Sequence, residues 1–124
     1  TIRTMAQSKV IHCTSIQAYQ DALQEAQDRL VVVDCYADWC GPCRAMSPIF
    51  EALSIQFPDI VFIKVDTDQA PEVKSILGVW ALPTFAFVRN GLKISSFAGA
   101  NERALRQGLQ NNGELGYCSS CAIA

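Results

Sequence analysis

The sequence predicts a single α/β domain in which a central mixed β-sheet is flanked by helices on both faces. About half of the 124 residues are hydrophobic, which suits one compact core and leaves little room for two. Segments with strand and helix periodicity alternate along the chain. One strand–helix–strand unit spans about 36 residues from 30 to 65, so its two strands are expected to be parallel.

The first half of the chain contains three strand candidates, at 9–13, 30–36 and 60–65, and two helix candidates, at 15–27 and 42–57. The run at 30–36 is apolar on both alternating faces, which is typical of a central strand covered on both sides. Thr14-Ser15 followed by Gln17 is typical of a helix N-terminus. Pro48 lies within the second helix and is expected to kink it.

The second half begins with a short helix, which Pro71 opens and Gly78 ends. Strands at 84–89 and 92–97 flank the dipeptide Asn90-Gly91, a strong signal for a two-residue hairpin.

Asn101 can cap a last helix that ends near Gly113. The residues after it show no periodicity and indicate a mobile tail. The predicted organisation is an N-terminal extension at 1–8, the folded domain at 9–112 and a flexible tail at 113–124.

Charge and composition exclude several function classes. The chain has 10 basic and 12 acidic residues, without the basic excess of a nucleic-acid-binding domain. No apolar run approaches the roughly 20 residues of a transmembrane helix, and the first dozen residues contain no signal-peptide stretch, so we expect a cytosolic protein. The single histidine, His12, disfavours His-based metal sites and Ser-His-Asp hydrolases.

Four of the six cysteines form two Cys-x-x-Cys pairs. The first, Cys40 and Cys43, follows the predicted buried strand and opens a helix, where unpaired N–H groups and the helix dipole stabilise a thiolate. Such sites lower a cysteine pKa into the range of roughly 3.5 to 7.5. A structural disulfide would close a tiny loop and add little stability. A zinc site is disfavoured because 74 residues separate Cys43 from Cys118, so we predict a redox pair and no metal.

The motifs VVVDCYADWCGPCR at 31–44, KVDTD at 64–68, LPTF at 82–85 and FAGA at 97–100 together resemble the thioredoxin family. The resemblance covers about residues 8–112, with the motifs in the expected order and spacing. It implies the thioredoxin fold and protein-disulfide reductase activity.

Four catalytic roles follow from this resemblance. Cys40 takes the place of the nucleophile, and the less exposed Cys43 that of the resolving cysteine. Asp34 matches the buried carboxylate that exchanges a proton with the resolving thiol, and a lone acid in an apolar strand should independently have a raised pKa. Lys64 matches the lysine beside that carboxylate. The alternatives are a strand-end Asp34 with ordinary hydrogen bonds and a solvated edge position for Lys64.

The resemblance also implies a docking surface for substrate. Pro83 matches a cis-proline that faces the active site, and the backbone of Leu82 would pair with an extended substrate segment. A flat, weakly charged surface would be completed by Trp39, Gly41, Pro42 and Gly99. Simple core filling is the alternative for Trp39.

Three residues depart from the family pattern without removing a chemical role: Tyr36 stands where tryptophan is frequent, Cys35 where phenylalanine is frequent and Arg44 where lysine is commoner. Cys35 and Cys13 are interpreted as small buried hydrophobic residues. For Cys13 the alternative is a position exposed enough for the thiol to be oxidised.

The predicted function is that of a cytosolic protein-disulfide reductase, expected to be monomeric and to need no bound cofactor beyond its own dithiol. By resemblance, its partners are a flavin-dependent thioredoxin reductase that uses NADPH and disulfide-containing targets such as peroxiredoxin-type or reductase-type enzymes. An isomerase or oxidase is disfavoured by the Gly-Pro dipeptide and the missing signal peptide. A binding module without turnover is disfavoured because both active-site cysteines are present.

The second cysteine pair, Cys118 and Cys121, admits three interpretations. Cys121-Ala122-Ile123-Ala124 has the C-a-a-X form of a farnesylation site, and a palmitoyl group on Cys118 would add the second signal that stable membrane anchoring needs. The pair could instead pass electrons to or from Cys40 and Cys43. The tail cysteines could also be idle, or the chain end could differ from the native one.

Overall fold

The structure, a computed structural model, describes residues 8–123, with side chains described over 8–113. The elements in chain order are β1 (Ile11–Cys13), α1 (Ile16–Ala26), β2 (Val31–Tyr36), α2 (Gly41–Gln56), β3 (Val61–Asp66), α3 (Glu72–Leu77), β4 (Thr84–Arg89), β5 (Leu92–Ala98) and α4 (Glu102–Ile123). The predicted order of strands and helices is confirmed. α2 continues through Pro48, and the kink there stays a prediction.

The five strands form one mixed sheet in the order β1-β3-β2-β4-β5. β2 and β3 are parallel, as the strand–helix–strand unit predicts, and β1 is also parallel to β3. β4 runs antiparallel to β2, and β5 runs antiparallel to β4. β2 therefore occupies the centre of the sheet, which explains its apolar residues on both faces.

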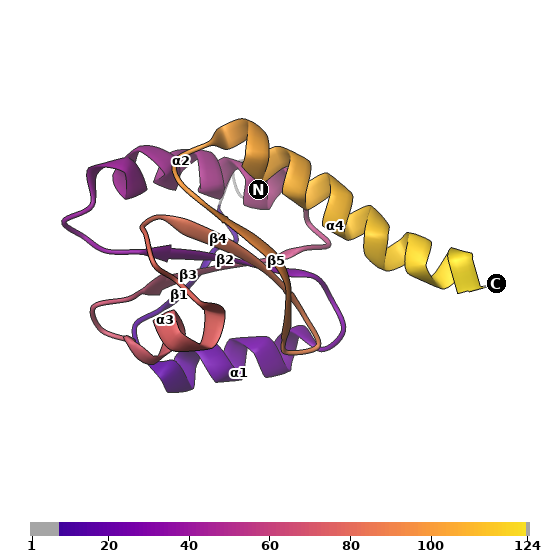
Figure 1. Cartoon of the computed structure of the whole chain (residues 1–124), viewed down its shortest axis with the longest axis horizontal. Coiled ribbons are helices and arrows are strands. Elements are labelled where there is room, and N and C mark those ends of the chain that lie inside the picture. The colour runs from indigo at the N-terminus through magenta and orange to yellow at the C-terminus, as the bar shows by residue number, and fades with distance from the viewer. Residues whose placement is uncertain (1–7, 124) are drawn as a thin grey trace, which may run out of the picture.

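Helices cover both faces of the sheet. Figure 1 shows α1 and α3 below it and α2 and α4 above it. Each side has its own core, and neighbouring residues of β2 alternate between them: Val33 and Cys35 pack on the α1 and α3 side, Val32 on the α2 and α4 side. Because side chains alternate along a strand, Asp34 shares the face of Val32 and points toward α2.

The local signals at element ends have the expected geometry. The Ser15 side chain accepts a hydrogen bond from the Ala18 N–H at 3.0 Å. Asn101 Oδ1 likewise accepts from the Ala104 N–H at 3.0 Å. Asn90 and Gly91 have φ angles of 55° and 78°, the left-handed pair that a type I′ hairpin turn requires.

α4 is longer than the sequence predicts. It runs to Ile123 instead of ending near Gly113, and in Figure 1 its last turns project beyond the sheet. Glycine weakens a helix without ending it, and no proline follows Gly113. The division into extension, domain and tail stays a prediction. No helix in the described part of the chain is both long and apolar enough to cross a membrane.

α4 packs closely on β4 at a glycine. Leu105 and Leu109 are buried on the same side of the sheet as Phe87, and Gly108 lies directly over the Phe87 ring. A Cβ atom at position 108 would overlap that ring. Glycine is therefore required there for the observed approach of helix and sheet.

Candidate active site

Cys40 and Cys43 form a disulfide at the start of α2. Their Cα atoms lie 5.2 Å apart, and Cys40 is the N-cap residue of the helix. Its sulfur accepts a hydrogen bond from the Cys43 N–H at 3.2 Å. The first cysteine thus lies where unpaired N–H groups and the helix dipole favour a negatively charged sulfur.

Both cysteines of the disulfide are largely buried. Cys40 is 5% exposed and Cys43 is 3% exposed, so the expected contrast between an exposed first and a less exposed second cysteine is nearly absent. They form a small apolar cluster with Ala37, against which Tyr36 and Leu82 pack. Side chains from β2 and from the loop before β4 therefore contribute to the burial of the disulfide.

Asp34 is fully buried at the centre of the sheet. Asp34 lies within β2 and not at its end, and neither of its carboxylate oxygens has a hydrogen-bond partner among the described residues, so the alternative of a strand-end carboxylate with ordinary hydrogen bonds is wrong. Burial raises its pKa to about 7, while the positive charge of Lys64 acts in the opposite direction. A carboxyl group with such a pKa can both accept and release a proton near neutrality.

Lys64 lies on β3 directly opposite Asp34. It is 8% exposed, and β3 lies between β1 and β2, so the alternative of a solvated edge lysine is wrong. Its Nζ donates a hydrogen bond to Ser47 Oγ at 2.8 Å and lies 4.4 Å from the centroid of the Tyr36 ring. No ion pair joins it to Asp34 within the described residues.

The peptide bond between Leu82 and Pro83 is cis, as predicted. Pro83 is buried, and its carbonyl oxygen accepts a hydrogen bond from the Gly99 N–H at 2.8 Å. Gly99 has a φ of 111°, a backbone conformation that favours glycine. The structure therefore brings Leu82, Pro83 and Gly99 together, with Leu82 against the disulfide cluster.

Trp39 is 69% exposed, which contradicts simple core filling. Its indole N–H donates to Asp68 Oδ2 at 2.9 Å, so a residue of the KVDTD motif fixes the ring beside Cys40. Gly41 and Pro42 are also exposed. Trp80 is even more exposed, at 85%, and was not among the predicted site residues. The sequence indication for it was its position as an aromatic residue two positions before Leu82.

A cavity of about 270 Å³ lies beside the second cysteine, and its lining includes Cys43, Ser47 and Lys64. Sequence reasoning also missed Ser47. The available signal was its spacing, because a residue four positions after Cys43 lies on the same face of a helix.

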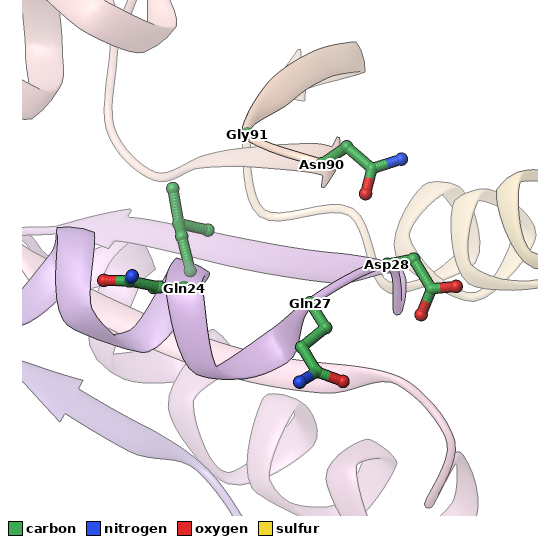
Figure 2. A pocket seen from close by; sticks show the side chains of 6 residues that line it. Gln24, Gln27, Asp28, Asn90 and Gly91 are labelled. Carbon is green, nitrogen blue, oxygen red and sulfur yellow. The ribbon is translucent and has the colours of Figure 1, made fainter.

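A second hollow, of about 590 Å³, lies between the end of α1 and the β4–β5 turn. Figure 2 shows Gln24, Gln27 and Asp28 on one side and Asn90 and Gly91 on the other. It lies at the end of the sheet where β2 begins, opposite the disulfide, and it contains no cysteine. We assign it no part in the chemistry.

The remaining cysteines fall into two groups. Cys13 and Cys35 are free and buried, at 1% and 0% exposure, which excludes the exposure that was left open for Cys13. Burial raises the pKa of Cys13, and it raises that of Cys35 to about 12. The side chains of Cys118 and Cys121 lie outside the described part of the chain. Within that part, no cluster of three or more histidine, cysteine or acidic residues could hold a metal ion.

Comparison with known proteins agrees with this geometry. The family model for thioredoxin matches residues 10–111. The chain is 46% identical over 105 residues to a thioredoxin of Ictalurus punctatus, covering 83% of this chain and 98% of the relative. It is 45% identical to thioredoxin-3 of Dictyostelium discoideum, with coverages of 85% and 98%.

Solved structures show the same likeness. The crystal structure of Fasciola hepatica thioredoxin matches with a TM-score of 0.78 and 39% identity, over 82% of this chain and 97% of that one. A thioredoxin of Nicotiana alata matches with a TM-score of 0.80 and 33% identity, over 85% and 93%. With Cys40 and Cys43 as its redox-active pair, this chain belongs to the thioredoxin family of protein-disulfide oxidoreductases.

Proposed function

We propose that this protein reduces disulfides in other proteins by thiol–disulfide exchange through Cys40 and Cys43. The Cys40 thiolate attacks one sulfur of a target disulfide, forms a mixed disulfide with it and expels the other target sulfur as a thiolate. The Cys43 thiolate then attacks Cys40 Sγ and expels the second target sulfur. Two electrons pass to the target, which takes up two protons, and the Cys40–Cys43 disulfide forms.

The observation that supports this order is the position of Cys40 at the helix N-cap, where its sulfur accepts the Cys43 N–H. This arrangement favours the thiolate at Cys40 over that at Cys43. The disulfide is the product state of the reaction. Return to the dithiol needs two electrons, and we propose that an NADPH-dependent thioredoxin reductase supplies them.

We assign Asp34 the role of proton relay for Cys43. The resolving thiol must lose a proton before it attacks the mixed disulfide. Asp34 points toward α2 from the centre of the sheet, and its pKa of about 7 suits a general base at neutral pH. Lys64 would favour the ionised form of Asp34 and so assist this step.

Target binding is assigned to the surface around the disulfide. The backbone of Leu82, next to cis-Pro83, would pair with an extended segment of the target. The exposed residues Trp39, Gly41 and Pro42 would provide the surrounding contact area, with Gly99 keeping the approach open. This surface suits disulfide-bearing proteins such as peroxiredoxin-type or reductase-type enzymes.

Trapping of intermediates tests the assignment of the two cysteines. Cys43→Ser should accumulate a mixed disulfide with target proteins, because resolution is blocked, and Cys40→Ser should accumulate none. The products are separated on non-reducing gels and identified by mass spectrometry. Equal trapping by the two variants would contradict the assignment.

Turnover separates a reductase from a binding module. The wild-type protein should reduce insulin disulfides continuously when NADPH and a thioredoxin reductase are supplied. If the protein is instead a module that binds its partner without turnover, its reduced form would bind the partner and no NADPH would be consumed. Cys40→Ser is the matched control, since it keeps the surface and removes the nucleophile.

We propose in addition that Cys121 is farnesylated and Cys118 palmitoylated, which would tether the protein to a membrane. The support is the C-a-a-X form of the last four residues, and the proposal requires that Ala124 ends the native chain. Expression in a eukaryotic cell tests it by intact mass and fractionation against Cys121→Ser. Wild type should gain one prenyl group, lose three residues and associate partly with membranes. If wild type is unmodified and Cys121→Ser reduces disulfides more slowly, the result would instead support electron transfer between the tail pair and Cys40 and Cys43.

A further inference from the structure

The ammonium group of Lys64 is held by two contacts from different elements. Its Nζ donates to Ser47 Oγ on α2 at 2.8 Å, and it lies over the Tyr36 ring of β2, 4.4 Å from the centroid. Since Lys64 is only 8% exposed, these contacts replace most of the hydration that a charged amine needs. The Ser47 hydroxyl is the one oxygen that accepts from Nζ among the described residues.

Ser47 connects this ammonium to the redox pair. It follows Cys43 by one helical turn, and residues four apart lie on one face of a helix. Cys43, Ser47 and Lys64 accordingly line the same cavity of about 270 Å³. The hydroxyl that accepts the hydrogen bond from Lys64 therefore lies on the same helix face as the resolving cysteine.

The position of the ammonium matters because the Asp34 carboxylate has no hydrogen-bond partner among the described residues. Lys64 is paired with Asp34 across β2 and β3, and no described residue donates a hydrogen bond to the carboxylate. The charge of Lys64 opposes the effect of burial on the pKa of Asp34. Any displacement of Nζ therefore changes the proton affinity of the buried acid.

We propose that Ser47 is a positioning residue for the resolving step, and that its hydroxyl holds the Lys64 ammonium where its charge acts on Asp34. This inference rests on the proposed proton relay. Without the hydroxyl, the ammonium loses its oxygen partner. The cavity reaches the surface, because the exposed residues Asp38 and Arg44 also line it. The ammonium then moves toward water and away from Asp34, which binds its proton more tightly.

The other groups around the cavity and Asp34 should stay unchanged in a Ser47 variant, because none of their described contacts involves Ser47. Arg44 Nη1 is held by the Asp38 carbonyl oxygen at 2.7 Å. On β4, the residue opposite Asp34 is Phe85, which carries no charge. The remaining titratable and charged side chains, from β2, the following loop, α2 and β3, are Cys35, Tyr36, Asp38, Cys43, Arg44 and Asp66. A change in the titration of Asp34 is then attributable to Lys64.

Titration of the Asp34 carboxyl carbon by NMR in the oxidised protein tests the proposal, because the disulfide cysteines do not titrate in that state. The midpoint in Lys64→Met, which lacks the charge, should lie furthest above wild type. The Asp34 midpoint in Ser47→Ala should lie between those of wild type and Lys64→Met. Ser47→Thr restores a hydroxyl and should return the midpoint toward wild type. Alanine is the best helix former, so Ser47→Ala is expected to fold.

Ser54→Ala is the matched control. It removes a hydroxyl from the same helix, but Ser54 bonds the Glu51 carbonyl oxygen and the Lys9 N–H and does not touch the cavity. Its titration should match that of wild type. A Ser47→Ala midpoint equal to wild type, or below it, would overturn the proposal.

The rate of resolution provides a second measurement. The pH at which resolution of a preformed Cys40 mixed disulfide reaches half its maximal rate should move upward in Ser47→Ala, together with the NMR midpoint. Failure of the proposed function is distinguishable, because wild type would then not reduce insulin at all. In that case the NMR titration would still decide whether Ser47 positions Lys64.

Discussion

Replacing Asp34 with asparagine should remove most of the pH dependence of stability between about pH 4 and pH 8. Burial raises the pKa of Asp34 from its ordinary value of 3.8 to about 7. The folded protein therefore prefers the protonated carboxyl. The stability that this preference provides is fully present below pH 3.8 and is lost as the pH rises through about 7. At about 1.4 kcal/mol for each pH unit in that window, the total loss is on the order of 4 kcal/mol.

Asparagine has nearly the shape of the protonated carboxyl and never ionises. The protonated carboxyl is buried without a described hydrogen-bond partner as well, so the variant differs by the additional buried N–H donor of its amide, a pH-independent cost of about 1–3 kcal/mol. At pH 8 the variant should therefore be more stable than wild type by roughly 1–3 kcal/mol. At pH 4 it should be equally or less stable.

Urea unfolding of the oxidised proteins at half-unit steps from pH 4 to pH 8.5 measures this difference. The free energy of unfolding of wild type should fall with rising pH relative to that of Asp34→Asn. Asp59→Asn is the control, because Asp59 is an exposed carboxylate in the loop before β3. A constant difference between wild type and Asp34→Asn across the whole range would refute the argument from burial.

Two further predictions concern packing. Gly108→Ala should lower Tm, because the new Cβ atom would overlap the Phe87 ring. This overlap costs about 1–3 kcal/mol, which outweighs the gain of about 1 kcal/mol in helix propensity. A higher Tm would contradict this reasoning, because it would mean that the Phe87 ring moves aside at no energetic cost. In the reduced, folded protein, Cys13 and Cys35 should resist iodoacetamide until unfolding, because both thiols are buried and have raised pKa values. Peptide mass spectrometry measures this, and labelling of either thiol in the native state would contradict it.

Most of the fold could be predicted because its signals are local. The apolar run of β2, the Ser15 and Asn101 caps and the Asn90-Gly91 turn each depend on residues close together in the chain. The end of α4 could not be predicted in this way. Glycine is compatible with both a helix and its termination, so Gly113 does not decide between them.

In the candidate site, too, the features that depend on residues close together in the chain could be predicted, and those that depend on packing between elements could not. A lone acid in an apolar strand is sufficient to predict the environment of Asp34, because the strand residues on either side of it, Val33 and Cys35, are buried with it. The partner of Lys64 depends instead on Ser47, 17 residues away, and on how α2 packs over β3. A lysine in a strand gives no sign of whether its amine reaches water, an aromatic ring or a hydroxyl on another element. The side chain that controls the charge beside Asp34 therefore becomes visible only when helix and sheet are in place.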